Sequence, residues 1–424
     1  MPLYCESLQS WTSAQDIFCS IFANQPNCFW LDRQNHPTSP YSIMGIGYPS
    51  QEIDLDETFE DIDLPFAFRP MLVGVMNYSD SKEFTGSGHW LKVDRAFVYD
   101  HTDKRLYFIG RFDNRAEFDQ WHHAALLRLA LIGGDSASYA LHNQAATSAE
   151  LVCLDSQSIY QEKIEKAKDY IAKGDVYQLC LTTRLVGEYQ GDELSYFLRL
   201  RKQNPAPYAS FIRVGNKTFV SISPERFMSV ESQVVTSSPI KGTRPRSQDL
   251  EIDAQLAAEL SESDKERAEN LMIVDLVRND LSMICAPESI LVSDLLKVRS
   301  YSTVHQLVSD VSGKLREGVR TSQAIAALFP GGSMTGAPKL RAMEIISELE
   351  SSERGGYSGA IGWVAGNGNL DLGMVIRTAI FDSGKVTIGI GGGITSGSEP
   401  EAEHQEIQIK AQALVSALSA AVRW

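Results

Sequence analysis

The chain has 424 residues, of which 43% are hydrophobic and 22% charged, and its formal net charge is −15. These proportions indicate a globular protein with room for at least two folding units, and they exclude bulk disorder. The acidic balance argues against nucleic-acid binding, which needs basic stripes. No apolar run approaches the roughly 20 residues that span a bilayer, so no membrane association is expected.

The first twenty residues favour a cytoplasmic location, because they lack a basic segment followed by an apolar run. Six cysteines are scattered without a CxxC pair, which is typical of free thiols in a reducing compartment. His122 and His123 are adjacent and would point in different directions on a helix, so we expect no zinc site.

Residues 1–145 form an N-terminal region that we predict to be rich in strands. β-Branched and aromatic residues between turn signals mark the segments 41–48, 71–78, 95–100 and 105–112. Residues 135–155 are polar and weakly periodic, and they form the predicted linker to the second region.

Residues 150–424 form the second region, in which strands and long helices occur in separate groups. The pattern predicts a helix over 159–174 closed by Gly174, then strands up to 238, then one long helix over 249–284. A further helix is expected after Pro338, followed by strands and a terminal helix from about Pro400. Grouping of this kind favours an α+β fold over a doubly wound parallel sheet.

Two glycine-rich segments fail the usual nucleotide-binding patterns. FPGGSMTGAPK (329–339) continues with Ala-Pro after Gly336 instead of Lys-Ser/Thr, and GIGGGITSG (389–397) does not satisfy GxGxxG. Both segments are compatible with simple turns. The functional alternative is that Gly391, Gly392 and Gly393 follow a strand and leave backbone N–H groups free for an anion.

Glu269 projects from a largely apolar face of the long predicted helix. A buried carboxylate is costly unless a cation or hydrogen-bond donors compensate it. An ion pair with Lys265 or Arg278 would do so, and a metal ion would do so equally well. The residues alone leave both interpretations open.

Glu403 and Glu406 lie three residues apart near the start of the terminal helix. Acidic residues there favour the helix dipole, and Glu406 with Lys410 is an ordinary pair at i,i+4 spacing. Two or three carboxylates completed by water and substrate oxygens are, however, a typical Mg²⁺ arrangement.

Glu225 and Lys241 are the pair on which we expect the chemistry to depend. SISPERF (221–227) and SSPIKGTRPR (237–246) are separated by the short strand ESQVVTS, so a strand–turn–strand layout would bring both side chains near one sheet edge. The alternative is a surface salt bridge across a hairpin.

The order of motifs over residues 155–424 resembles that of the chorismate-utilising enzymes. The motifs are GDVYQLCLT, SPERF, PIKGTRPR, ERAENLMIVDLVRNDL, YSTVHQLVS, FPGGSMTGAPKLRAMEII, GAIGW, IRTAI, GIGGGIT and EAEHQE. The resemblance implies large antiparallel β-sheets packed as a sandwich with helices on the outside, in which residues 1–145 and 150–424 interdigitate.

Two positions resemble the branch of this family that aminates chorismate without releasing pyruvate. That branch carries PIKGT around Lys241, where anthranilate synthases have alanine. Isochorismate and salicylate synthases have a water-activating lysine at the position of Gln178, so Gln178 indicates ammonia as the nucleophile.

The resemblance implies conversion of chorismate and ammonia to 4-amino-4-deoxychorismate, on the route to p-aminobenzoate and folate. Lys241 would be the covalent nucleophile and Glu225 the general acid/base. Mg²⁺ would be held by Glu269 and Glu406, with Glu403 beside them. The substrate-binding residues would be Gln178, Thr243, Lys339, Tyr357, Arg377, Gly391, Gly392 and Gly393.

Further features of the sequence bear on the source of ammonia and on the branch of the family that the chain resembles. No cysteine lies in a nucleophile-elbow context, so we expect a separate glutamine amidotransferase subunit to supply ammonia. Gln306 stands where family members usually have a histidine associated with elimination chemistry, which fits a product that keeps its enolpyruvyl group. Anthranilate synthase component I and a non-catalytic chorismate-binding paralogue remain the alternatives.

Overall fold

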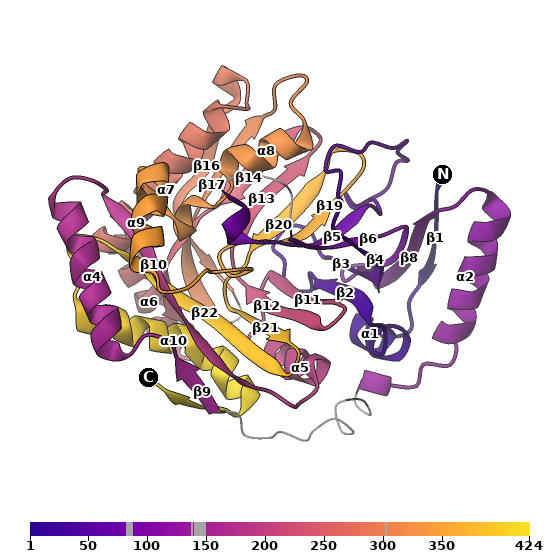
Figure 1. Ribbon diagram of the computed structural model, residues 1–424. Helices are drawn as coiled ribbons and strands as arrows, with labels where there is room; N and C mark the ends of the chain where they lie inside the picture. Colours follow the sequence, from indigo (N-terminus) through magenta and orange to yellow (C-terminus); the bar gives the residue numbers. More distant parts are fainter. Residues whose placement is uncertain (82–87, 137–138, 140–149, 302) are drawn as a thin grey trace.

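Two large β-sheets form the centre of the computed structural model, which describes residues 1–81, 88–136, 139, 150–301 and 303–424 (Figure 1). The first sheet has 13 strands. In spatial order they are β1 (Leu3–Gln9), β8 (Arg105–Arg111), β7 (Arg95–Asp100), β3 (Tyr41–Ile46), β2 (Asn27–Asp32), β11 (Tyr208–Val214), β12 (Lys217–Ser223), β21 (Thr378–Asp382), β22 (Lys385–Ile394), β10 (Gln178–Glu188), β9 (Glu150–Cys153) and β23 (Ala421–Arg423), with β18 (Gly336–Ala337) beside β10.

The second sheet has ten strands. In spatial order they are β15 (Ile240–Pro245), β17 (Val304–Lys314), β14 (Val234–Ser238), β13 (Arg226–Glu231), β20 (Leu370–Met374), β19 (Ala360–Val364), β5 (Leu72–Met76), β6 (Gly88–Lys92) and β4 (Tyr48–Ser50), with β16 (Leu291–Ser300) beside β17. The strands that carry the site are paired antiparallel, whereas β23 and β9 are parallel.

Both sheets contain strands from the N-terminal and the C-terminal parts of the chain, each as one continuous block, and the two blocks meet once in each sheet. In the first sheet β2 pairs with β11, and in the second sheet β5 pairs with β19. Residues 137–138 and 140–149, which belong to the predicted linker over 135–155, lie outside the described residues.

The helices lie on the outer faces of the sheets (Figure 1). They are α1 (Ala14–Ile21), α2 (Arg115–Leu129), α4 (Gln157–Ala172), α5 (Glu193–Gln203), α6 (Leu250–Glu262), α7 (Asp264–Ser282), α8 (Thr321–Leu328), α9 (Lys339–Leu349) and α10 (Pro400–Leu418), with short 3-10 turns η1 (Tyr78–Ser81), η2 (Pro287–Ser289) and η3 (Gly332–Met334). None of the described helices is long and apolar enough to cross a membrane.

The core has separate layers that correspond to this arrangement. One cluster lies between the sheets and includes Phe29 and Ile212 from the first sheet with Val73 and Ile361 from the second. A second cluster lies under α1, α4, α5, α9 and α10, and a third packs α7 and α8 on the second sheet. Two packed sheets with helices outside confirm the predicted α+β sandwich.

Several predicted elements differ from the structure in identifiable ways. The long helix over 249–284 is two helices, because Ser263 leaves the helical conformation (φ −65°, ψ 106°) and its side chain accepts a hydrogen bond from the Glu266 N–H as the cap of α7. Helix α2 was not expected in the strand-rich region. Its weak apolar periodicity explains this, since only three of its 15 residues, Phe118, Ala125 and Leu129, are buried.

Candidate active site

Lys241 on β15 and Glu269 on α7 form a nearly buried ion pair. Lys241 Nζ lies 3.5 Å from Glu269 Oε2, and the side chains are 13% and 11% exposed. The predicted partners of Glu269 are wrong, because Lys265 lies near Glu403 and Arg278 pairs with Asp275. The second carboxylate oxygen of Glu269, Oε1, is buried and has no hydrogen-bond partner.

Local structure explains how this pair is brought together. A bulge interrupts the register of β15 between Lys241 and Thr243, and Gly242 supplies the positive φ of +70° that the bulge requires. On α7 the fully buried Asn270, next to Glu269, donates a hydrogen bond to the Pro239 carbonyl and accepts one from Ser309. The helix is therefore anchored to the residue that precedes β15 and to β17, the strand that pairs with β15.

The glycines of β22 allow this close arrangement. A Cβ atom at position 393 would lie 3.2 Å from Lys241 Nζ and 3.9 Å from Glu269 Oε2, and a Cβ at position 392 would lie 3.1 Å from Glu403 Oε2. Gly391, Gly392 and Gly393 are part of the strand, in register with residues 182, 181 and 180 of β10. The expectation that they follow the strand is therefore wrong.

Among the described residues, no strand pairs with the opposite edge of this glycine segment. β21 pairs with β22 only over residues 385–388. Backbone groups of the glycine segment on that edge are thus available to a ligand or to side chains of α10, as the hydrogen bond from Lys410 Nζ to the Gly391 carbonyl (3.0 Å) shows.

Glu403 and Glu406 on α10 lie on the other side of β22. Glu403 accepts a hydrogen bond from Ser398 (2.7 Å), and its Oε1 lies 3.8 Å from Lys265 Nζ. Glu406 pairs with Lys410 at 2.6 Å, as expected from their spacing. Burial, followed by the charge of Glu406, raises the pKa of Glu403, while burial also acts on Glu406 but is outweighed there by Lys410, which lowers its pKa.

The carboxylates fit a hard cation such as Mg²⁺. Glu266, one turn before Glu269, has its pKa raised by burial and then by the charge of Glu269, so negative charge is concentrated here. Mg²⁺ usually takes one or two carboxylates and completes its shell with water and substrate oxygens. In the described part of the chain, no three His, Cys, Asp or Glu side chains form a ready metal cage. Glu269, with its unpartnered oxygen, and Glu406 are the donors that fit.

Glu225 lies in the loop before β13 and is buried, so a surface salt bridge with Lys241 is excluded. Burial raises the pKa of Glu225 to about 7, while the Ser333 hydroxyl, the charge of Lys241 and the Ile240 N–H act in the opposite direction. Glu225, Ser333 and Asp280 line a cavity of about 10 Å³, the size of one water molecule. A carboxyl group that titrates near neutrality beside a lysine is suited to proton transfer.

Arg377 and Tyr357, the predicted carboxylate-binding pair, lie close enough to influence each other electrostatically. Arg377 is held in a left-handed conformation (φ +50°) and donates to the Lys410 carbonyl at 2.9 Å. Burial lowers the pKa of Arg377, and the nearby Tyr357 and Glu406 oppose that effect. Tyr357 packs directly on Gly389, where a Cβ atom would meet its ring at 2.1 Å.

The remaining predicted residues occupy different settings. Gln178 is 2% exposed, and its Oε1 has no hydrogen-bond partner. Thr243 is exposed and accepts a 3.5 Å hydrogen bond from Gln306. Lys339 is already satisfied by Asp280 (2.6 Å) and by the Leu328 carbonyl (3.0 Å), so its contribution would be to hold the cavity beside Glu225.

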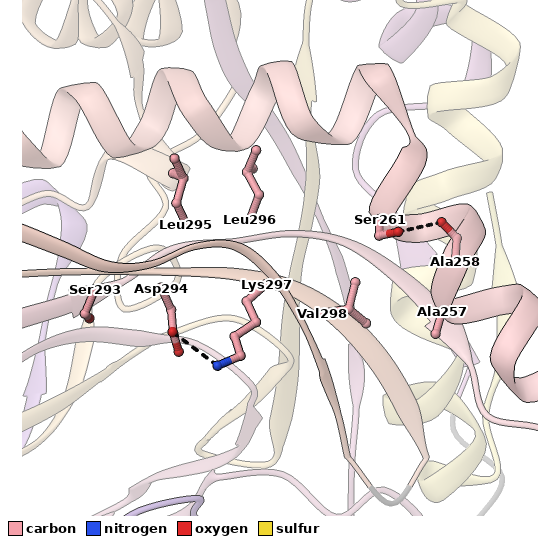
Figure 2. A pocket seen from close by; sticks show the side chains of 9 residues that line it. All are labelled: Ala257, Ala258, Ser261, Ser293, Asp294, Leu295, Leu296, Lys297 and Val298. Atoms are coloured by element: carbon pink, nitrogen blue, oxygen red, sulfur yellow. Dashed lines mark hydrogen bonds and ion pairs between the residues drawn. The ribbon is translucent and has the colours of Figure 1, made fainter.

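A wider groove of about 650 Å³ lies elsewhere, between α6 and β16 (Figure 2). It is lined by Ala257, Ala258, Ser261 and residues 293–298, and the Asp294–Lys297 ion pair (3.3 Å) lies on its wall. None of the predicted site residues lines this groove.

The structure combines a sandwich of two sheets with a lysine and several carboxylates beside a glycine-rich strand. Comparison with known proteins identifies the family that has this arrangement. The chain matches the chorismate binding enzyme family over residues 19–416 and belongs to that family. Aminodeoxychorismate synthase component 1 of Klebsiella aerogenes is 36% identical over 406 residues, covering 93% of this chain and 81% of that protein.

Other relatives extend the comparison. Aminodeoxychorismate synthase of Streptomyces pristinaespiralis is 33% identical over 456 residues, which cover 96% of this chain and 63% of that longer protein. The chain spans 51% of the Streptomyces griseus relative. Among solved structures, anthranilate synthase component I of Streptococcus pneumoniae superposes with a TM-score of 0.77 at 25% identity, over 98% of this chain and 93% of that one. The menaquinone-specific isochorismate synthase of Escherichia coli has the same fold (TM-score 0.74, 17% identity, 98% of this chain and 95% of that one).

Some residues at the site were not singled out from the sequence. Ser333 and Asp280 occur inside recognised motifs, but only the three-dimensional structure places both beside Glu225. Asn270 follows Glu269 directly, and its position as a polar residue in an apolar helical pattern is the signal that could have identified it.

Proposed function

We propose that this protein is the aminating component of an aminodeoxychorismate synthase, converting chorismate and ammonia to 4-amino-4-deoxychorismate for p-aminobenzoate and folate synthesis. The observation that carries the proposal is the placement of Lys241, within PIKGT, against Glu269 and Gly393. Relatives named aminodeoxychorismate synthase component 1 support the same reading.

The proposed chemistry divides one difficult substitution into two steps. Lys241 first loses the proton of its ammonium group to solvent. The neutral Nζ then forms a bond to C2 of chorismate, the ring double bonds shift, and the C4–O bond breaks. Glu225 gives its proton to the departing hydroxyl, which leaves as water. Ammonia then forms a bond to C4 while the bond from C2 to Lys241 breaks, and the proton lost by the new ammonium group returns to Glu225.

Glu269 and Glu406, with Glu403 beside them, would hold Mg²⁺. When bound, the ion would neutralise a substrate carboxylate and polarise the ring system. The unpartnered Oε1 of Glu269 supports this assignment. Lys265 lies 3.8 Å from Glu403 and Lys410 lies 2.6 Å from Glu406, so each of these carboxylates also has a positively charged neighbour.

The remaining polar groups would orient the substrate and the nucleophile. Arg377 with Tyr357 would bind the enolpyruvyl carboxylate, and N–H groups of the glycine segment would bind the ring carboxylate. Gln178 would face the incoming ammonia, which its unpartnered Oε1 supports because an amide oxygen accepts hydrogen bonds from an N–H group. Thr243 would complete the rim.

Ammonia would come from a separate glutamine amidotransferase subunit. The designation "component 1" of the enterobacterial relatives implies a second component. We place the activity in the cytoplasm, because all six cysteines are free, as expected in a reducing compartment.

Identification of the product tests the proposal. The protein is incubated with chorismate, Mg²⁺ and an ammonium salt, and the products are separated and weighed by mass spectrometry. We expect 4-amino-4-deoxychorismate, lost when EDTA removes the metal. Anthranilate, isochorismate or unchanged chorismate would each contradict the proposal, and anthranilate would favour the alternative supported by the 34% identical anthranilate synthase component 1 of Acetivibrio thermocellus.

A further inference from the structure

Two residues other than glycine take a left-handed backbone conformation in the loops that carry the predicted carboxylate-binding pair. Ser358, which directly follows Tyr357, has a φ of +66°, and Arg377 has a φ of +50°. This conformation is costly for a residue with a Cβ atom, because that atom lies too close to the following carbonyl oxygen. Among the eight residues of this kind in the described part of the chain, Ser358 alone is completely buried. Packing against other segments therefore enforces its conformation, as is common at binding sites.

Ser358 and Arg377 both lie where the chain passes between the two sheets. Tyr357 packs on Gly389 of β22 in the first sheet, and the chain enters β19 of the second sheet two residues after Ser358. Arg377 lies between β20 of the second sheet and β21 of the first sheet. Each left-handed residue thus reverses the chain at a crossing, and each crossing carries one member of the pair.

Hydrogen bonds join the two crossings and fix Ser358 through both its backbone and its side chain. The Ser358 N–H donates to the Val375 carbonyl (2.9 Å), and the Val375 N–H donates to the Gly359 carbonyl (2.9 Å). Ser358 Oγ accepts a hydrogen bond from Arg354 Nη1 (3.3 Å). The guanidinium of Arg354 is in turn held by both carboxylate oxygens of Glu350, at 2.9 and 2.7 Å.

A glycine at position 358 would avoid the steric cost, and the chain has glycine at the neighbouring positions 355, 356 and 359. Serine instead restricts the backbone through its Cβ atom and supplies the hydroxyl that Arg354 binds. We propose that Ser358 is a positioning residue, whose left-handed turn holds the Tyr357 ring against Gly389 so that Tyr357 and Arg377 are preformed for a carboxylate group of the substrate. The carboxylate-binding role of the pair rests on the proposed function, whereas the position of Tyr357 does not.

Unfolding by urea tests whether the backbone at Ser358 is strained. Ser358→Ala and Ser358→Gly both remove the hydroxyl, but only the alanine has to bear the left-handed conformation. We expect the unfolding equilibrium constant to be about 2- to 5-fold smaller for the glycine variant than for the alanine variant, the reverse of the usual order. The usual order at position 358, with alanine the more stable, overturns the proposal.

Ser195 is the matched control position. It is also a buried serine, 2% exposed, but it lies in the first turn of the right-handed helix α5, and its hydroxyl has no hydrogen-bond partner. Ser195→Gly should therefore be less stable than Ser195→Ala. Greater stability of the glycine variant at both positions would show that the order at position 358 does not report left-handed strain, which also overturns the proposal.

The position of Tyr357 is measured by ¹⁹F NMR on protein labelled with 3-fluorotyrosine. The Tyr357 signal is assigned as the one that disappears in Tyr357→Phe. We expect it to be displaced from free fluorotyrosine in the unaltered protein, because the ring packs on Gly389, and to sharpen and move toward the free position in Ser358→Gly. Ser195→Gly should leave it unchanged. An unchanged Tyr357 signal in Ser358→Gly overturns the proposal, and so does an equal shift in Ser195→Gly.

Kinetics with chorismate connect the position of Tyr357 with substrate binding. Ser358→Gly should raise KM about 2- to 10-fold and leave kcat nearly unchanged, because a loosened Tyr357 must be ordered when the substrate binds. A lower kcat at the original KM contradicts the positioning role. A shifted ¹⁹F signal in a protein whose unaltered form yields no aminated product would retain that role and reject the proposed function. If Ser358→Ala does not fold, the ¹⁹F signal and KM of Ser358→Gly still decide the proposal, since glycine adopts the left-handed conformation without steric cost.

Discussion

Two ion pairs lie beside Cys180 and Gly393, which face each other on neighbouring strands. The two ion pairs differ in how fully their hydrogen-bonding groups are satisfied. Arg354 and Glu350 meet through two hydrogen bonds of 2.7 and 2.9 Å, and Glu350 also accepts from the N–H and hydroxyl of Thr182. Lys241 and Glu269 meet at 3.5 Å, and one oxygen of Glu269 has no partner. Both pairs are nearly or fully buried, so both bear the cost of removing charge from water.

This difference separates an ion pair that stabilises the fold from an ion pair that is available to bind a ligand. A buried pair with every donor and acceptor satisfied gains nothing from a further partner. A buried pair with an unsatisfied oxygen carries a penalty that a bound cation or substrate can relieve. The comparison therefore predicts that the first pair governs stability and that the second governs activity.

The largest effect is expected for Lys241→Ala. Removing the proposed nucleophile should lower the amination rate by about 10³-fold or more and abolish any covalent adduct detectable by mass spectrometry. Lys241→Arg keeps the charge opposite Glu269 and should be equally inactive. The melting temperature of Lys241→Ala should fall less than that of Glu350→Ala. Amination at the original rate by either lysine variant would remove Lys241 from the chemistry.

Glu350→Ala should have the opposite profile. It leaves the buried Arg354 guanidinium without its counter-charge, which costs about 3 to 5 kcal/mol of unfolding free energy. Glu353→Ala, an exposed residue in the same loop, is the control and should stay within about 0.5 kcal/mol of the original protein. Urea denaturation measures both. Equal unfolding free energies of Glu350→Ala and Glu353→Ala would contradict the conclusion that the Arg354–Glu350 pair governs stability.

Glu225→Gln should stabilise the protein while removing activity. The folded pKa of about 7 lies above the ordinary 4.5, so the folded state holds the proton more tightly than the unfolded state. Stability is therefore lost as the pH rises from 4.5 to 7, by up to about 3 kcal/mol. The glutamine variant escapes this loss, so its advantage should be near zero at pH 4.5 and largest above pH 7.

Denaturant midpoints across this pH range measure that advantage. Glu231→Gln, at the exposed end of the same strand β13, should show no pH-dependent gain. A gain for Glu225→Gln that is constant with pH would indicate that Glu225 is not held protonated by its surroundings.

Gly393→Ala is expected to have the smallest effect. The new methyl group would lie 3.2 Å from Lys241 Nζ, a distance at which the lysine must move slightly, so we expect about a 10-fold loss of kcat/KM with the fold retained. Gly397→Ala is the control, because nothing lies within 4 Å of a Cβ atom there. Indistinguishable kinetics of the two variants would show that Lys241 tolerates displacement.

Much of the fold and the composition of the site could be predicted from the sequence, because motifs with fixed spacing carry that information. β7 matches its predicted segment, and α9 and α10 begin where Pro338 and Pro400 indicated. The break at Ser263 was missed because the polar residues around it, SESDKER (261–267), include no glycine or proline, and the serine was not considered as a helix cap.

Contacts between distant segments could not be predicted in the same way. The partner of Glu269 was sought at helical spacing, in Lys265 and Arg278, whereas the actual partner lies 28 positions earlier on a strand. Arg354 gave no signal at all, since a single arginine between Glu353 and Gly355 reveals nothing about carbonyl groups at positions 180 and 334. Such contacts depend on how two sheets are stacked, which local patterns do not encode.

The glycine strand also limits how this protein can acquire a new specificity. Gly392 and Gly393 present only backbone beside Glu403 and Lys241, so that wall holds no side chain that selection could exchange for another. Additions there are restricted by clashes with ionised groups, while β15 and α7 on one side of the strand and α10 on the other carry side chains that can vary. Divergence within this architecture should therefore proceed on those three elements, against a backbone surface that stays the same.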